Sequence, residues 1–280
     1  MTRRPGSLGW PPTTDLEIES RAVPDATIVA IANQKGGVGK STTAINLGAG
    51  LAYQGERVLI VDLDPQGNTT SGLGIDRGTI EYSTYDLLVG DVGVLEVLEP
   101  SSVRGLYVVP ATIELAGAEI ELVSMFSRET RLGNALKPAA EDYHFILIDC
   151  PPSLGLLNVN GLSAAHEVLI PIQCEYYALE GVGQLVKNVQ LVQNNLNPQL
   201  VIEGVVLTMF DGRTTLAADV VTEVRQHFGD TAYRTVIPRT VRLSEAPSYG
   251  EPIEAYDPMS RGAIAYRELA REFRRRHGRT

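Results

Sequence analysis

Near the start of the chain, a short apolar run breaks into a glycine-rich loop and then restarts with a helical pattern. The run covers residues 28–32, and the loop contains Gly36, Gly37 and Gly39. Glycines let the backbone take positive φ and turn its N–H groups inward, which forms a nest for an anion. Residues 41–50 are expected to begin a helix whose free N–H groups point at the same anion. This order of strand, loop and helix predicts a cradle for phosphate groups.

The residues at the end of the loop predict a nucleoside triphosphate site. Lys40 supplies a mobile positive charge for the β- and γ-phosphates, and Ser41 supplies a hydroxyl for Mg²⁺. The usual pattern has a glycine five positions before Gly39, but Gln34 stands there and Lys35 follows it. A glycine turn made for packing alone is the competing interpretation, and the Gly-Lys-Ser string after an apolar strand disfavours it. The loop therefore carries two lysines.

The string from Lys35 to Ser41 resembles the deviant Walker A motif of the ParA/MinD group of P-loop ATPases. This resemblance implies ATP and Mg²⁺ as ligands, with phosphate contacts that also include Val38 and Thr42. It further implies an ATP-sandwich dimer, in which Lys35 reaches across to the nucleotide of the second subunit.

Two further apolar runs end in acidic residues. Residues 57–63 read as a buried parallel strand, and Asp64-Pro65 follows. Residues 143–148 read the same way and end at Asp149, where a carboxylate can hold Mg²⁺ or its waters. Ligands of open α/β sheets bind at the carboxyl ends of strands. We therefore expect Asp64 to orient the attacking water and to join Asp149 and Ser41 around the metal, although Asp64-Pro65 could also simply initiate a turn.

The string from Asp62 to Asn68 closely resembles chromosomal ParA proteins of the Soj type. The similarity covers nearly all of the chain from Thr27 to the last helix. In that family, the aspartate in the place of Asp64 orients the water. We expect adenine contacts from Met209 and from the loop Pro238 to Thr240.

Strand-like runs alternate with helical patterns after residue 26, which predicts an α/β fold with a doubly wound, mostly parallel sheet. With 280 residues and 44% hydrophobic residues, we expect a single P-loop NTPase-like domain over residues 27–280, flanked by helices and ending in a basic helix. Residues 1–26 show no apolar period and are expected to form a disordered or loosely attached arm. They lack the apolar core of a signal peptide, and no run is long enough to span a membrane.

Apolar residues recur at helical spacing over residues 113–126, and we do not expect this stripe to bind a ligand. We interpret it as core or dimer surface, because apolar residues at helical spacing usually pack against protein. Its members are Leu115, Ile120, Leu122, Val123 and Phe126.

The net charge of −10 argues against DNA binding by the whole surface, so any contact must be local. Arg213 and Arg242 lie in loops that match Soj-like ParA sequences, where the corresponding arginines contribute to nonspecific DNA binding by the ATP-bound dimer. Arg239 would extend this strip. Surface arginines paired with nearby acids are the competing interpretation.

The resemblance implies a Mg²⁺-dependent ATPase that partitions chromosomal or plasmid DNA. Its ATP-bound homodimer would bind double-stranded DNA nonspecifically, and a ParB-type centromere-binding protein would stimulate hydrolysis. A cytoplasmic, nucleoid-associated location follows.

Two alternatives remain from the sequence. A MinD-like membrane-switching ATPase would need a membrane-binding tip on the last helix, which begins near Ser260; the tip lacks bulky apolar residues, so no membrane partner is expected. A metal-cluster carrier of the same ATPase group would need bridging cysteines, and the spacing of Cys150 and Cys174 does not favour one.

Overall fold

The computed structural model describes residues 26–175 and 178–279. The arm expected at residues 1–26 therefore lies outside the described residues, except for its last residue. Ala26 is buried, and its N–H donates to the carbonyl oxygen of Ala140 at 3.0 Å.

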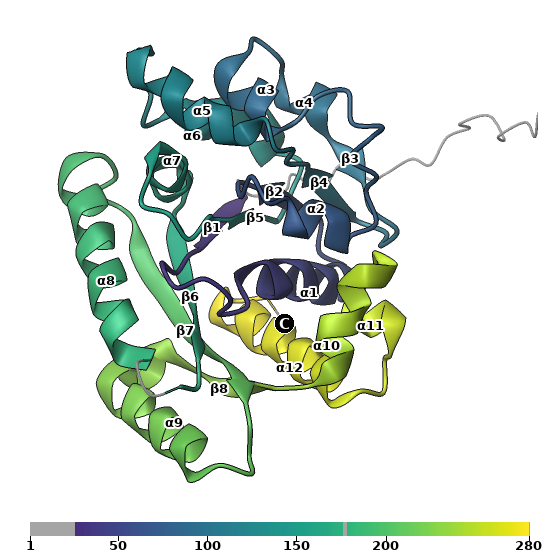
Figure 1. Ribbon diagram of the computed structural model, residues 1–280, viewed down its shortest axis with the longest axis vertical. Helices are drawn as coiled ribbons and strands as arrows, with labels where there is room; N and C mark the ends of the chain where they lie inside the picture. Colours follow the sequence, from purple (N-terminus) through teal and green to yellow (C-terminus); the bar gives the residue numbers. More distant parts are fainter. Residues whose placement is uncertain (1–25, 176–177, 280) are drawn as a thin grey trace, which may run out of the picture.

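An eight-stranded sheet forms the middle layer, in the order β3-β4-β2-β5-β1-β6-β7-β8 (Figure 1). All neighbouring strands are parallel except β3, which runs antiparallel to β4. The strands are β1 (Thr27–Ile31), β2 (Val58–Asp62), β3 (Glu99–Pro100), β4 (Leu106–Val109), β5 (Phe145–Asp149), β6 (Glu167–Gln173), β7 (Val201–Phe210) and β8 (Ala232–Pro238). The doubly wound, mostly parallel sheet and the single domain predicted from the sequence are confirmed.

Helices cover both faces of the sheet, so the domain has three layers (Figure 1). The α-helices are α1 (Lys40–Tyr53), α2 (Asn68–Gly72), α3 (Thr84–Val89), α4 (Val94–Val97), α5 (Leu115–Glu121), α6 (Arg131–Ala140), α7 (Leu156–Ala164), α8 (Ala178–Asn195), α9 (Thr215–Phe228), α10 (Val241–Glu245), α11 (Ile253–Tyr256) and α12 (Arg261–Arg276). Three 3₁₀ turns complete them: η1 (Leu122–Ser124), η2 (Gly229–Thr231) and η3 (Ala246–Tyr249).

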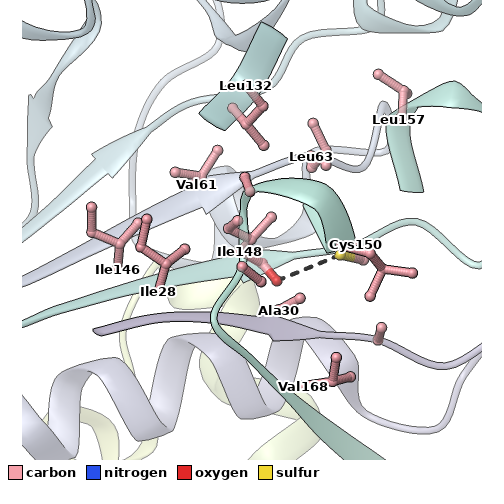
Figure 2. Packing of buried hydrophobic residues seen from close by; sticks show 14 of the residues in the cluster. Ile28, Ala30, Val61, Leu63, Leu132, Ile146, Ile148, Cys150, Leu157 and Val168 are labelled. Atoms are coloured by element: carbon pink, nitrogen blue, oxygen red, sulfur yellow. Dashed lines mark hydrogen bonds between the residues drawn. The ribbon is translucent and has the colours of Figure 1, made fainter. Parts of the chain in front are cut away.

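Alternate residues of the central strands point into two separate cores, as the two-residue period of a strand requires. In β1, Ile28 and Ala30 join the core beneath α3 to α9, whereas Val29 and Ile31 join the core beneath α1 and α12. Figure 2 shows the first core, where Ile28 and Ala30 pack beside Ile148 of β5. Burial on both faces explains why these strands read as continuous apolar runs.

The strand order reverses direction at β1. After β1 the chain moves to β2 and β4 on one side, and after β5 it crosses β1 to reach β6 on the other. Ligands of such sheets bind outside the carboxyl ends of the strands at this switch point. The glycine loop that follows β1 therefore stands where a ligand is expected.

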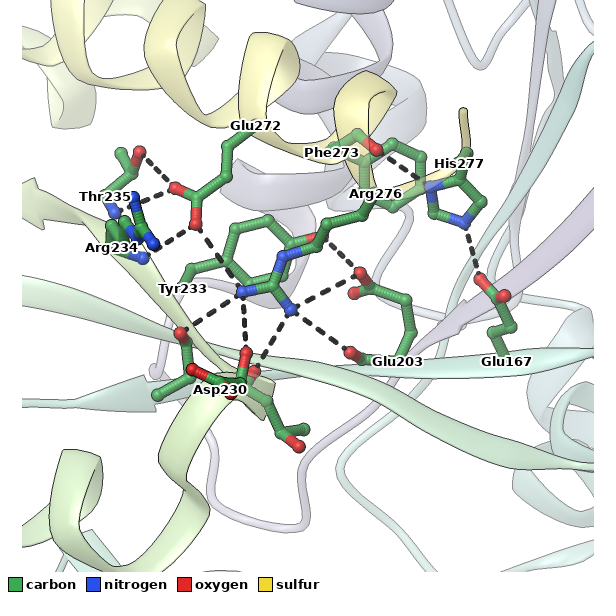
Figure 3. Close-up of polar contacts among 12 residues, drawn as sticks. Glu167, Glu203, Asp230, Tyr233, Arg234, Thr235, Glu272, Phe273, Arg276 and His277 are labelled. Carbon is green, nitrogen blue, oxygen red and sulfur yellow. Dashed lines mark hydrogen bonds and ion pairs between the residues drawn. The ribbon is translucent and has the colours of Figure 1, made fainter. Parts of the chain in front are cut away.

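A cluster that we call the C-terminal dock fixes the end of α12 to β7, β8 and β6 (Figure 3). Glu272 accepts hydrogen bonds from the N–H groups of Arg234 and Thr235 at 2.8 and 3.0 Å. The Arg276 guanidinium lies 3.9 Å from the centroid of the Tyr233 ring and donates to the carbonyl oxygens of η2 and β8. His277 completes the dock through Glu167 of β6, at 2.7 Å.

Two apolar faces expected from helical spacing are only partly buried. In the stripe over residues 113–126, Leu115 and Leu122 are fully buried, but Ile120, Val123 and Phe126 are exposed. On α12, Ile264 is 45% exposed, because the docked face of that helix is made by its neighbours at helical spacing. Those buried neighbours are Ala263, Tyr266, Leu269 and Phe273.

Candidate nucleotide site and the neighbouring basic loops

The loop between β1 and α1 is held open by glycine backbone geometry and by ties to two other strands. Gly37 and Gly39 have φ of 73° and 90°, and Gly39 caps the start of α1. The Asn33 amide donates to the carbonyl oxygen of Pro171 at 2.8 Å, and the Thr208 hydroxyl donates to that of Val38 at 2.8 Å. These ties anchor the loop to β6 and β7, so its shape does not depend on a bound ligand.

The loop faces a cavity of about 770 Å³. A Cβ atom built on Gly36 or Gly37 would meet nothing within 4 Å, so the backbone of this loop borders open space. The lining includes most of the predicted nucleotide contacts: Gly36, Gly37, Gly39, Lys40, Ser41, Thr42, Asp64, Met209, Pro238 and Thr240. Val38 is buried beneath the loop and can contribute only its backbone. Loop and cavity fit the phosphates of a nucleotide.

Lys40 is a buried charge with few partners. Its side chain is almost fully enclosed, and its one hydrogen bond among the described residues goes to the Lys35 carbonyl oxygen at 3.4 Å. Burial lowers the pKa of Lys40, which the carboxylates of Asp149 and Asp64 partly oppose. A buried ammonium gains most from an anion, so Lys40 suits a phosphate.

Asp149 and Asp62 lie side by side at the carboxyl ends of β5 and β2. Both are fully buried, and burial raises the pKa of Asp149 to about 7 and that of Asp62 to about 6. Thr69 donates to Asp149 Oδ2 at 2.8 Å, whereas Asp149 Oδ1 is buried with no hydrogen-bond partner among the described residues. An unpartnered oxygen beside Ser41, whose hydroxyl lowers the pKa of Asp149, fits Mg²⁺ or a water bound to it.

No group of three or more His, Cys, Asp or Glu residues that could hold a metal by itself occurs in the part of the chain that the structure describes. Mg²⁺ does not require such a group, because it usually takes one or two protein ligands and completes its shell with water and phosphate. Cys150 and Cys174 are both buried free cysteines.

Asp64 reaches the cavity from the turn after β2. Its Oδ1 accepts a hydrogen bond from the Gln66 N–H at 3.0 Å, and its carbonyl oxygen accepts one from the Gly67 N–H at 2.8 Å. These bonds fix the carboxylate at the cavity wall. The competing interpretation, in which Asp64-Pro65 initiates a turn, also holds, since the residues after Asp64 do form a turn.

Lys35 does not line the cavity that Lys40 enters. Its ammonium pairs with Glu175 Oε2 at 3.0 Å, and the side chain is 40% exposed. The two lysines of the loop therefore face different surroundings: one is enclosed over the cavity, and the other lies at the surface.

The opposite wall of the cavity comes from the ends of β7 and β8. Met209 has a φ of 53°, which is uncommon for a residue other than glycine and stores strain on the order of 1 kcal/mol. Pro238 and Thr240 line the same wall. Strain of this kind gathers at binding sites, which agrees with the predicted adenine contacts there.

The three predicted DNA-binding arginines follow the carboxyl ends of neighbouring strands, since Phe210 of β7 pairs with Pro238 of β8. The Arg213 side chain is 88% exposed and donates two hydrogen bonds to the Asp211 carboxylate, at 2.8 and 2.6 Å. Arg242 pairs with two carboxylates, Glu245 and Asp257, at 3.0 and 3.4 Å. Arg239 instead lines the nucleotide cavity. Both the functional and the paired-surface interpretations of Arg213 and Arg242 therefore remain compatible with their contacts.

Sequence reasoning gave no role to four residues that hold the site together. Asp62 accepts from the N–H and hydroxyl of Thr70 at 2.8 and 2.7 Å, which ties α2 to the end of β2. Thr69 and Thr208 make the bonds to Asp149 and Val38 described above. The signal for Asp62 was available, because it is the last residue of an apolar strand, whereas the threonines act through contacts distant in sequence.

A doubly wound parallel sheet, with a glycine loop and an enclosed lysine at its switch point, defines the class of P-loop nucleotide-binding proteins. A family model described as "AAA domain" matches residues 26–202. Sporulation initiation inhibitor protein Soj of Bacillus subtilis (strain 168) is 60% identical over 88% of this chain and 97% of its own. Chromosome partitioning protein ParA of Myxococcus xanthus is 54% identical over 89% and 88%. The chain belongs to the ParA/Soj family of P-loop ATPases.

Solved structures agree with this assignment. Cobyrinic acid a,c-diamide synthase from Mycobacterium smegmatis, with bound ATP analogue and magnesium, matches with a TM-score of 0.80 and 42% identity over 90% of this chain and 96% of that one. The septum site-determining protein MinD from Pyrococcus horikoshii, complexed with Mg-ADP, matches with a TM-score of 0.73 and 27% identity over 90% and 98%. The predicted ATPase class and the ligands ATP and Mg²⁺ are confirmed at this level.

Helices long and apolar enough to cross a membrane do not occur among the described residues.

Proposed function

We propose that this chain is a DNA-partitioning ATPase that acts in the segregation of a chromosome or plasmid. The Myxococcus xanthus relative, which covers 89% of the chain, supports this role, because it is named a chromosome partitioning protein. The chain would act in the cytoplasm at the nucleoid. The role requires an ATP cycle coupled to DNA binding, and the described contacts suggest how each part works.

In the cavity, the chain's own residues bind the phosphates and position water. Lys40 and the loop N–H groups neutralise the triphosphate, and Asp64 orients the attacking water at the γ-phosphate. Bound Mg²⁺, held by Ser41 and Asp149 with Asp64 nearby, would neutralise further charge on the phosphate oxygens. The unpartnered Oδ1 of Asp149 is the observation that supports this metal position.

The single observation that carries the dimer is the placement of Lys35. Its side chain lies outside its own cavity and is exposed, so it is free to reach a second copy once the bond to Glu175 is exchanged. This placement supports our proposal of an ATP-sandwich homodimer, in which Lys35 contacts the phosphates of the second subunit. ATP would then link dimerisation to the state of the nucleotide.

DNA binding would use Arg213 and Arg242, and Arg239, which lines the nucleotide cavity, would extend this strip. The two loops leave the sheet at adjacent strand ends, so a dimer would present a local basic strip on an acidic chain. Each arginine would exchange an acidic partner for a DNA phosphate. Because each neutralised phosphate adds about 0.9 to the salt slope, retention should be steeply salt-dependent. A ParB-type partner would stimulate hydrolysis and return the dimer to monomers.

A MinD-like membrane switch is the alternative. The apolar face of α12 packs against the rest of the domain, and its residues Tyr266, Leu269 and Phe273 are buried. This leaves little apolar surface at the basic tip for insertion into a lipid headgroup layer, so we favour DNA.

The test is retention on nonspecific double-stranded DNA with ATP, ADP or no nucleotide, at two salt concentrations. We expect retention only with ATP, with a loss at the higher salt, and a loss in Arg213→Glu and Arg242→Glu. Arg104→Glu is the matched control, since Arg104 is exposed before β4 near the other edge of the sheet.

Equal retention on DNA with ATP, with ADP and without nucleotide would contradict the proposal. Retention that persists in both loop variants would contradict it as well. Sedimentation with anionic vesicles in ATP, without any retention on DNA, would instead support the membrane switch.

A further inference from the structure

An exposed apolar stripe runs along α5 and the turns on either side of it. We call it the α5 patch and define it as Ile113, Ala116, Ile120, Val123 and Phe126. Four of its side chains are 63%, 79%, 59% and 96% exposed, in the order Ile113, Ile120, Val123 and Phe126. The spacing of three and four residues puts Ala116, Ile120 and Val123 on one helical face, and the turn residues Ile113 and Phe126 continue the stripe before and after it.

Two exposed carboxylates, Glu114 and Glu121, lie between members of the α5 patch, whereas Glu119 accepts a hydrogen bond from the Leu157 N–H at the start of α7. No lysine or arginine occurs from residue 105 to residue 127. An apolar stripe with an acidic border suits a segment that combines large apolar side chains with positive charge.

The patch is too small for a stable contact between two folded copies. A standard interface uses roughly 20–30 residues on each side, whereas the α5 patch has five members. A short peptide segment is the better match in size.

The first residues of this chain have the required chemistry. They contain Arg3, Arg4, Leu8 and Trp10, and no acidic residue precedes Asp15. In the sequence, the acidic residues of the arm begin at Asp15 and therefore come between this segment and β1.

The arm joins the fold within reach of the patch. It ends at Ala26, whose N–H bonds the carbonyl oxygen of Ala140 at the last turn of α6. Phe126 lies at the other end of α6, shortly before Arg131. Ten residues of helix measure about 15 Å, whereas the chain from Trp10 to Ala26 can extend to about 50 Å. The reach is therefore several times the separation along α6.

We propose that residues 3–12 of this chain dock on the α5 patch of the same molecule. Leu8 and Trp10 cover the stripe beside Ile120 and Phe126, and the two arginines face the acidic border. The arm is thus an intramolecular strap over a surface that would otherwise be open to a partner. This inference stands apart from the partition role and does not depend on it.

Trp10 is the only tryptophan of the chain, so its fluorescence reports directly on docking in the full-length protein. We expect blue-shifted emission and protection from acrylamide relative to a peptide of residues 1–25. Phe126→Asp and Ile120→Asp, both at exposed sites that folding does not require, should each shift the emission to longer wavelength and raise the quenching constant severalfold. Arg3→Glu combined with Arg4→Glu should do the same.

Met259→Asp is the matched control, because Met259 is a similarly exposed apolar residue (81%) outside the patch. It should leave Trp10 unchanged. Emission and quenching equal to those of the free peptide would overturn the proposal, as would protection that survives both patch substitutions. Protection that disappears on dilution would mean docking on a second copy, which also overturns it.

Discussion

Two clusters of buried charge differ in how their members are paired. In the C-terminal dock, Glu272 accepts four hydrogen bonds and Arg276 donates to several carbonyl oxygens. In the nucleotide site, Lys40 has one long bond, and Asp149 has an oxygen with no partner. Both clusters lie against the same sheet. In the dock the charges of Glu272 and Arg276 are paired within the chain, and Oε2 of the neighbouring Glu203 is the atom left without a hydrogen-bond partner among the described residues.

The difference separates structural from functional charge. A buried ion costs several kcal/mol unless protein groups replace its water. In the dock, Glu272 and Arg276 meet this requirement through partners within the chain, so their charges hold α12 in place. In the nucleotide site, protein groups do not fully replace the water around Lys40 and Asp149. A ligand with phosphates and Mg²⁺ would supply the missing partners. Substitutions in the two clusters should therefore affect different properties.

Asp64→Ala should give the largest effect. Removing a group that orients the reacting water typically costs about 100- to 10,000-fold in rate, while the phosphate cradle remains. We expect ATP hydrolysis to fall by that factor and nucleotide affinity to change little, as measured by phosphate release and by equilibrium binding. Undiminished hydrolysis would remove the assigned role.

Lys40→Ala should lower nucleotide affinity by about 100-fold, since a buried charged hydrogen bond contributes up to about 3 kcal/mol. Titration with a fluorescent ATP analogue measures this loss. Lys137→Ala removes an exposed lysine of α6 and is the control. If both variants bound the analogue like the wild type, the enclosed lysine would not be a phosphate ligand.

Arg276→Ala should act on stability alone. The guanidinium bonds Asp230 and Ala232 carbonyl oxygens at 3.1 and 3.2 Å and packs on Tyr233. We expect a loss of about 2 kcal/mol in the free energy of unfolding, measured by denaturant titration, with normal ATP affinity. Arg275→Ala, the exposed neighbour, should change neither quantity. A large fall in ATP affinity in Arg276→Ala would erase the distinction between the clusters.

The last prediction concerns pH. Burial raises the pKa of Glu203 to about 7, against opposing contributions from the Tyr233 hydroxyl and Arg276. The folded state therefore keeps a proton that the unfolded state loses near pH 4.5, so the free energy of unfolding falls as pH rises toward 7. One such group contributes at most about 1.4 kcal/mol per pH unit. Glu203→Gln should flatten the profile between pH 5 and 7; an unchanged slope would contradict the shift.

The core of the nucleotide site was predictable because its signals are local. The apolar run, the loop glycines and Lys40 are consecutive, and Asp149 ends a run of buried residues. The strand and helix ranges followed from the same periodicity, with ends displaced by a few residues.

Contacts between distant segments were not predictable. The bond from Thr208 to Val38 joins residues 170 positions apart, and no period encodes it. The exposure of Ile120 and Ile264 also depends on which helix lies opposite. The helical pattern of Ile120 and Ile264 would be the same if a neighbouring helix covered them, so the sequence does not show whether they are buried.

One measurement tests the comparison most directly: the free energy of unfolding of Asp149→Asn and Glu272→Gln, with and without a saturating Mg²⁺-ATP analogue. Both substitutions turn a buried carboxylate into an amide. A ligand that binds only the folded state stabilises it by an amount that grows with the logarithm of the ratio of ligand concentration to Kd. We expect Asp149→Asn to be as stable as the wild type, or more so, without ligand and to gain little from it. Glu272→Gln should be less stable and gain as much as the wild type. The reverse pattern, or the same response in both variants, would contradict the division of buried charge into a structural and a functional cluster.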